Sequence, residues 1–179
     1  KPKGFLQSKA LITVDAEPGQ AAGSFLGANA IKMQARAMPR NRERLVWLMH
    51  PDLEEQLPYL SAMAPFTYGI SAGGGLLPLD DEAMLEAARA RGTQPVMHLS
   101  TLTESGQFDT GRAMFILTDF EAQGRLAAEV LQTVLRKNFA GLDVDFEYLP
   151  GQLAEAYAAF LARLRQLLAA QGRFLWAAL

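Results

Sequence analysis

The sequence predicts an α/β fold with a parallel sheet over most of its length. From about residue 57 onward, short apolar runs of strand character alternate with longer runs of helical spacing. One short run, within residues 140–148, contains aliphatic and aromatic residues and lies between two helical runs. Such alternation gives parallel strands joined by right-handed crossovers. Before residue 50 the alternation is absent, so we expect a separate α+β segment there.

Three segments after residue 80 have the apolar spacing of amphipathic helices, namely residues 81–91, 118–137 and 152–170. The first opens with acidic residues and stops at Gly92, a common residue just after a helix. Either Thr118 or Asp119 can cap the second helix. The strands are expected within residues 58–69, 95–100, 140–148 and 173–178.

The N-terminal part has weaker signals. Residues 5–14 have the alternation of a strand, residues 25–38 have helix-like spacing, and residues 44–49 form a short apolar run. A helix with proline in its first turn is expected over residues 51–57. None of these segments is expected to add a parallel strand to the sheet of the C-terminal part.

Three carboxylates occupy alternate positions in the central predicted strand. Because a strand repeats every two residues, Asp143, Asp145 and Glu147 are expected on one face, with Glu147 nearest the C-terminal rim. Like charges at this spacing are destabilising unless they share protons or meet partners. A solvated edge strand is the alternative interpretation. A strand between helices favours instead an acidic active site at the carboxyl end of a parallel sheet.

The same stretch, AGLDVDFEY at residues 140–148, resembles the D-G-x-D-x-D-x-E signature of the family 18 glycoside hydrolases. The resemblance is strongest to the chitinase-like branch that includes spore-cortex and peptidoglycan N-acetylglucosaminidases. Gly141 and the three acids match the signature, and Tyr148 matches a tyrosine that often follows it. The leading aspartate of the family is replaced by Ala140, which removes a supporting carboxylate at the start of the strand.

The resemblance extends over about residues 57–179, where the predicted strands correspond in order to the second, third, fourth and fifth strands of the family barrel. It implies a partial (β/α)8 TIM-type barrel without strands six to eight. It also implies hydrolysis of glycosidic bonds next to N-acetylglucosamine, in chitin or peptidoglycan, with retention of configuration. No cofactor or metal is implied.

In this family the acetamido oxygen of the substrate attacks the anomeric carbon, which replaces the second carboxylate of most glycosidases. The resemblance therefore implies that Glu147 is the general acid and then the base. Asp145 would orient the acetamido group and stabilise the oxazolinium charge, and Asp143 would tune Asp145 by sharing a proton. Tyr148 and Tyr68 are candidate substrate-binding residues, although Tyr68 could equally fill the top of the barrel.

The N-terminal part resembles a different family. Residues 4–6, 10–14 and 46–52, the last reading VWLMHPD, are similar to a central segment of tailed-phage major capsid proteins. We therefore predict two parts, a capsid-like segment at residues 1–57 and a partial barrel at residues 58–179. A fusion, a misassembled hybrid and a remote similarity mistaken for kinship are all open explanations of the join.

Composition and charge exclude few functions. Half of the residues are hydrophobic, and the net charge of −2 gives no electrostatic footprint for nucleic acid. The absence of cysteine excludes disulfides and thiolate metal sites. No apolar run of about 18 residues predicts a membrane span, and no leader pattern is visible. Localisation stays open, whereas the resemblance implies an extracellular, spore or cell-wall protein.

Two other features have ordinary interpretations. The run SAGGG at residues 71–75 lacks the pattern of a phosphate-binding loop and is expected to connect a strand to a helix. His50 and His98 are the two histidines of the chain, and neither lies in a metal-ligand pattern. His98 is expected to be a hydrogen-bonded histidine of the core or rim.

A glycan-cleaving enzyme is thus the first functional hypothesis, and a weakly active or inactive fragment is a variant of it. The second is a non-catalytic chain, either a capsid-derived structural piece or an inactive barrel fragment. A sheet with about half of the barrel strands leaves unpaired edges, which favour self-association.

Overall fold

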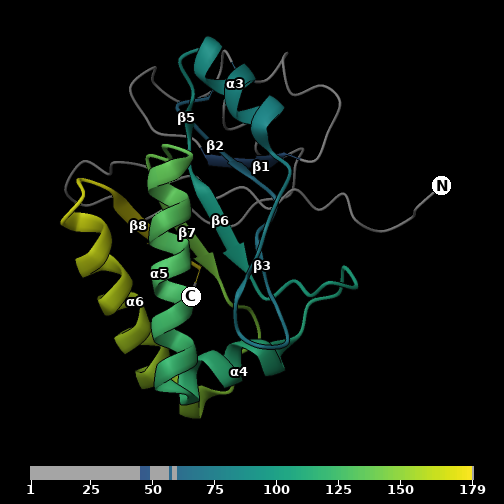
Figure 1. Cartoon of the computed structure of the whole chain (residues 1–179), viewed down its shortest axis with the longest axis vertical. Helices are drawn as coiled ribbons and strands as arrows, with labels where there is room; N and C mark the ends of the chain where they lie inside the picture. Colours follow the sequence, from purple (N-terminus) through teal and green to yellow (C-terminus); the bar gives the residue numbers. More distant parts are fainter. Residues whose placement is uncertain (1–44, 49–56, 58–59, 179) are drawn as a thin grey trace, which may run out of the picture. The chain divides into compact units, whose positions relative to one another are not determined.

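The computed structural model describes residues 45–48, 57 and 60–178 (Figure 1). These residues belong to two compact units, which we describe separately. Residues 1–66 and 81–95 contribute to the first unit, and residues 67–80 and 96–179 contribute to the second. The chain therefore passes between the units three times, each time in a short connection between two elements.

The first unit contains a three-stranded parallel sheet in the order β1-β2-β5. These strands are Leu45–Leu48, Ala62–Pro65 and Gln94–Pro95, and helix α3 is Glu82–Ala90. The helix buries Leu85 and Ala88, and Ala88 packs in a small core with Leu57 and Met63. The Thr93 hydroxyl donates to the carbonyl of Leu57 at 2.8 Å. This unit confirms the predicted helix at residues 81–91.

Strand β1 corrects one expectation. Residues 1–50 were expected to add no parallel strand, but Leu45–Leu48 pairs in parallel with all four residues of β2. The edge of a sheet presents unpaired backbone N–H and C=O groups, and an apolar strand such as β1 can pair with it. This pairing does not depend on the family that the sequence of the strand resembles. The other N-terminal expectations, over residues 1–44 and 49–56, lie outside the described residues. The predicted boundary between residues 57 and 58 stays a prediction.

The second unit is built on a parallel sheet in the order β6-β7-β8. These strands are Met97–Ser100, Gly141–Asp145 and Phe174–Ala177. Tyr68 continues the sheet beyond β6 through a parallel bridge to Leu99, and its backbone N–H donates to the carbonyl of His98 at 2.9 Å. The order confirms the predicted succession for the last three parallel strands, whereas the strand found within residues 58–69, Ala62–Pro65, pairs in the sheet of the first unit. The described strands form three separate sheets and do not close a barrel.

Helices α5 and α6, Phe120–Arg136 and Ala154–Ala169, lie beside this sheet (Figure 1). Both were predicted from their apolar spacing, and both bury that face, with Leu126, Val130, Phe160 and Leu164 in the core. The Asp119 side chain caps α5 by accepting from Ala122 N at 2.8 Å. Thr118 instead donates to a carbonyl one turn back, that of Met114. A short 3-10 helix, Gly151–Leu153, precedes α6.

Two features of the second unit were not predicted. Helix α4, Thr110–Thr118, is separated from α5 by a single residue, and Asp109 caps it by accepting from Gly111 N. Residues 71–75 do not lead into a helix. They close an antiparallel hairpin between β3, Gly69–Ile70, and β4, Leu76–Leu77. The Ser71 hydroxyl accepts from Gly75 N, so the turn is held by its own side chain.

Gly69 is required where the hairpin passes the end of β6. A Cβ added to Gly69 would lie 2.2 Å from the Leu102 carbonyl oxygen and 3.1 Å from Leu77 Cδ1. The Leu102 carbonyl cannot move without loss of its hydrogen bond from Ile70 N, which is 2.9 Å long. We expect Gly69→Ala to destabilise the chain by about 3 kcal/mol in urea unfolding, because overpacking against fixed backbone is costly.

Gly73 provides the matched control for this substitution. It lies in the same hairpin, and a Cβ there meets nothing within 4 Å. Gly73→Ala is expected to leave the urea midpoint unchanged or slightly raised, because it only restricts the unfolded chain. Equal midpoints for the two variants would show that the close approach at Gly69 does not constrain folding.

Among the described residues, no helix combines the length and apolar character needed to cross a bilayer.

Candidate active site

The central strand β7 has two different faces. On one face, Leu142 and Val144 are fully buried, and the Phe146 ring just beyond them stacks on Tyr157 and Phe160 of α6, with centroids 5.7 and 6.0 Å away. On the other face lie Asp143 and Asp145. The alternation predicted from the sequence is therefore confirmed for these residues. We call the surface that carries the two aspartates the acid face.

Asp143 and Asp145 are both buried, with 1% and 8% of their surface exposed. The strand register places His98 of β6 beside Asp143, and Ser100 beside Asp145. His98 Nε2 lies 3.8 Å from Asp143 Oδ2 and 3.7 Å from Asp145 Oδ2. One imidazole thus faces both carboxylates. Two buried carboxylates repel each other, and a ring N–H directed at both would offset part of that repulsion.

A threonine holds the opposite side of the imidazole. Thr67 Oγ1 lies 2.6 Å from His98 Nδ1 and 3.1 Å from Ser100 Oγ. All three side chains are buried, with at most 4% exposed. Sequence analysis placed His98 correctly in the hydrogen-bonded core but assigned it no part in the site. Thr67 and Ser100 were missed, because a threonine or serine in a strand has no distinguishing pattern.

Glu147 corrects a second expectation. It was expected on the same strand as the aspartates, but β7 ends at Asp145 and Glu147 lies in a turn. The strand pairing explains the end: Ser100 pairs with Asp145 and Ala177 pairs with Val144, so the ladders of β6 and β8 stop before Glu147. Glu147 is half-buried and follows directly beyond the carboxyl end of the strand.

Tyr148 completes that turn. Its φ of 57° lies in the left-handed region, which is uncommon for a tyrosine, and 88% of its surface is exposed. Such strained positions occur often at functional sites. The side chain is accessible to a ligand at the rim of the sheet, and its substrate role stays a prediction.

Two aromatic residues of β8 lie on the same face as the acids. Phe174 pairs with Gly141 and Trp176 pairs with Asp143, and the two rings are 4.4 Å apart. A Cβ on Gly141 would lie 2.4 Å from the Phe174 ring, which gives the glycine of the motif a packing role. Phe174 and Trp176 thus form an apolar surface beside the acids. Their alternation along β8 is the sequence signal that could have identified this surface.

Tyr157 joins the carboxyl ends of β7 and β8. Its hydroxyl lies 3.4 Å from the Val144 carbonyl and 3.3 Å from the Ala178 carbonyl. Burial raises the pKa of the Tyr157 phenol, and the charges of Asp145 and Asp143 raise it further. The phenol therefore stays neutral and can donate a hydrogen bond to either carbonyl.

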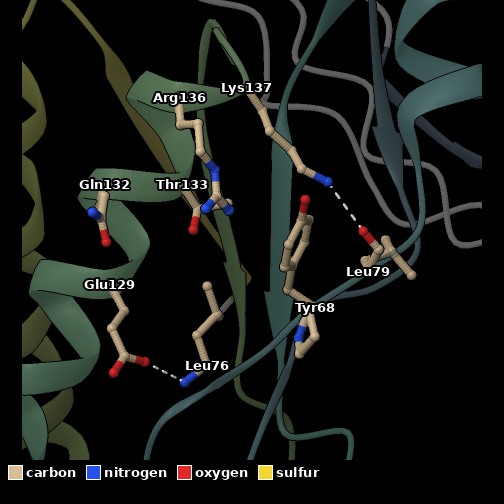
Figure 2. A pocket seen from close by; sticks show the side chains of 9 residues that line it. Tyr68, Leu76, Leu79, Glu129, Gln132, Thr133, Arg136 and Lys137 are labelled. Carbon is tan, nitrogen blue, oxygen red and sulfur yellow. Dashed lines mark hydrogen bonds between the residues drawn. The ribbon is translucent and has the colours of Figure 1, made fainter.

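Tyr68 does not join the site. Because it pairs with Leu99, it lies on the helix-covered face, opposite Asp143 and Asp145. Its ring is 1% exposed and meets Phe139 edge-on at 6.1 Å. Figure 2 shows it in a pocket of about 180 Å³ beside α5, with Lys137 above it. Of the two interpretations left open for Tyr68, this buried placement favours packing, and the substrate-binding role stays a prediction.

The residues present determine the available chemistry. Asp145 Oδ1 is buried and makes no hydrogen bond to any described residue, so it remains available as an acceptor. Glu147 lies two residues beyond the end of β7 and is half-buried. Across the described part of the chain, no group of His, Asp and Glu side chains has the arrangement of a metal site. The site fits acid and base chemistry on a ligand that has an N–H or a developing positive charge.

Loops at the carboxyl end of β6 border this region. Arg112 of α4 donates to the Ile70 carbonyl at 2.8 Å and to Glu104 at 3.2 Å. Glu104 also accepts from Ala72 N. Hydrogen bonds from its own backbone, Arg112 and Ala72 lower the pKa of Glu104. The β3–β4 hairpin and the loop after β6 are thereby tied together.

The fold and the acid face define an α/β chain with a carboxylate site at the end of its central parallel strand. No protein-family model matches the chain. Its sequence is 30% identical over 131 residues to YdhD of Bacillus subtilis, a protein named as a sporulation-specific glycosylase. The match covers 70% of this chain and 31% of the relative. The chain therefore spans about a third of the length of that relative.

Solved structures of glycan-cleaving enzymes share the fold. The chitinase of Chromobacterium violaceum superposes with a TM-score of 0.66 at 20% identity, over 73% of this chain and 43% of the chitinase. The spore cortex-lytic enzyme SleL of Bacillus cereus gives 0.64 at 21% identity, over 89% and 39% of the two chains. These similarities support the resemblance to chitinase-like and cortex-lytic enzymes. The capsid resemblance of residues 1–57 finds no support in them.

Proposed function

We propose that this chain carries the catalytic strand of a glycoside hydrolase that cleaves N-acetylglucosamine-containing glycan. The observation that most supports this proposal is the pair of buried aspartates on one face of β7, followed by Glu147 just beyond the strand end. Similarity to a glycosylase, a chitinase and a cortex-lytic enzyme supports this class of reaction. Peptidoglycan and chitin are the two substrate classes.

The proposed reaction has two steps and retains the anomeric configuration. In the first, Glu147 donates a proton to the glycosidic oxygen while the substrate acetamido oxygen attacks the anomeric carbon. The bond to the leaving group breaks, and an oxazolinium ion forms. In the second step, the Glu147 carboxylate removes a proton from water, which attacks the same carbon and reopens the ring. Glu147 is then protonated again.

The aspartates act on the acetamido group in this proposal. Asp145 accepts a hydrogen bond from the acetamido N–H through its available oxygen, which turns the acetamido oxygen toward the anomeric carbon. Its negative charge stabilises the oxazolinium ion. Asp143, deeper in the sheet, tunes the neighbouring Asp145 carboxylate. Tyr148 stays the candidate for sugar contact at the rim.

The stereochemistry of the product tests this proposal. A longer form of the protein, in which a complete barrel surrounds β7, is incubated with an N-acetylglucosamine oligomer, and the product is followed by proton NMR from the first minutes. The β anomer is expected first, because two displacements at one carbon restore the configuration. An initial α anomer would indicate direct attack by water and would exclude the acetamido mechanism.

Among the described strands, none borders the acid face beyond β8. We therefore propose weak or no turnover for residues 1–179 alone. Self-association through the free edges of the sheets follows from the same feature.

A further inference from the structure

We propose that His98 is a positioning residue of the acid face, which carries its proton on Nε2 and shares it between Asp143 and Asp145. The inference deepens the proposed function and rests on it for its catalytic consequence. Its structural part stands alone, because it concerns three buried side chains of one sheet.

The geometry gives Nε2 two equidistant carboxylate neighbours, both slightly beyond hydrogen-bonding distance. Its distances to Asp143 Oδ2 and Asp145 Oδ2, 3.8 and 3.7 Å, differ by a tenth of an ångström. The register explains this: His98 lies directly beside Asp143, and Asp145 is the next residue along on the same face. Among the described contacts of the imidazole, these two carboxylates are the charged groups, whereas Thr67, just before Tyr68, and Ser100 of β6 are neutral.

Thr67 sets the orientation of the ring. Its oxygen lies 2.6 Å from Nδ1, and its hydroxyl is also within reach of the His98 carbonyl at 3.2 Å. When the hydroxyl donates to Nδ1, the neutral ring must carry its proton on Nε2. When Nδ1 donates to the hydroxyl, the hydroxyl donates onward to the carbonyl. Only a ring protonated on both nitrogens then presents an N–H to the aspartates.

The first arrangement places a proton on Nε2 of the neutral ring, and the second does so only when the ring is protonated on both nitrogens. A bare Nε2 would set a lone pair against two carboxylates. Burial makes that contact costly, because a low dielectric strengthens repulsion as well as attraction. The shared proton holds the Oδ2 atoms of both aspartates toward β6. The Oδ1 atom of Asp145, which has no described hydrogen bond, is then left for the acetamido N–H.

Nitrogen NMR tests the proton position directly in the 179-residue chain. The chain has two histidines, so ¹⁵N-labelled protein gives two sets of ring signals, and His50→Gln identifies those of His98. Near neutral pH we expect Nε2 of His98 to carry a directly bound proton. In Asp143→Asn and in Asp145→Asn, the Nε2 signal shifts. In Asp80→Asn, at an exposed position, it does not. A ring protonated on Nδ1 alone, or an Nε2 signal unmoved by both substitutions, overturns the proposal.

Unfolding in urea provides a second measurement. His98→Gln keeps a buried N–H donor, whereas His98→Leu fills similar space with none. The leucine variant is expected to have an unfolding equilibrium constant about tenfold larger than the glutamine variant, because buried carboxylates lose their donor. Adding Asp143→Asn should recover part of that loss in the leucine background. Equal stability of the two variants, with no recovery, would show that His98 only fills space.

Neither measurement uses a glycan. An inactive complete-barrel form, together with the expected Nε2 signals in the 179-residue chain, would therefore contradict the glycosidase proposal and leave the proton assignment standing. An active protein with a bare Nε2 would do the reverse.

Discussion

Glu147→Gln is expected to abolish cleavage of a fluorogenic N-acetylglucosamine oligomer by a complete-barrel form of this protein. The amide keeps the size of the carboxyl group but cannot donate a proton to the leaving oxygen or remove one from water. General acid and base catalysis contributes about 10²- to 10⁴-fold to such rates, so kcat should fall within that range. Glycan binding, measured by calorimetry, should survive.

Two comparisons make this prediction specific. Glu155→Gln removes the same charge from an exposed position in the first turn of α6 and should leave kcat unchanged. An aryl glycoside whose leaving group departs without protonation should lose less activity in Glu147→Gln than an oligosaccharide does. Near-normal turnover of the oligosaccharide by Glu147→Gln, in an active parent, would remove Glu147 from the mechanism.

Asp145→Asn is expected to reduce kcat by about 10²- to 10³-fold with a much smaller change in KM. Asparagine retains an oxygen that can accept from the acetamido N–H, so the sugar still binds. The negative charge that stabilises the oxazolinium ion is lost, and this charge matters most in the transition state. Steady-state kinetics with the same fluorogenic oligomer measure both constants.

The control for Asp145→Asn is Asp109→Asn, at an exposed cap of α4 where asparagine can also accept from Gly111 N. It should leave both constants unchanged. If Asp145→Asn instead raised KM and left kcat intact, the aspartate would contribute only to binding, and the proposed electrostatic role would be wrong.

Local patterns predicted the helices and the acid pair well. Helices α3, α5 and α6 follow from apolar spacing, and the Asp119 cap follows from the residue types that accept hydrogen bonds from free backbone N–H groups. The opposite placement of Asp143 and Val144 on β7 follows from the two-residue period of a strand. Each of these features depends on neighbours within one or two turns of chain.

Features that depend on distant partners were not predicted. Glu147 lies off the strand because the paired segments of β6 and β8 end before it. The hairpin of β3 and β4 depends on contacts with residues after β6, such as the Leu102 carbonyl. Helix α4 is short and only weakly amphipathic. Its formation therefore depends more on packing beside α5 than on its own sequence pattern.

The sequence by itself determined that two aspartates share one face of a buried strand, because side-chain direction in a strand is a property of the covalent chain. It could not determine which side chains meet them. The tertiary structure brought His98 and Thr67 to the acid face and placed Tyr68 on the opposite face. The register between strands far apart in sequence is set by long-range hydrogen bonding, and a shift of one residue exchanges the faces.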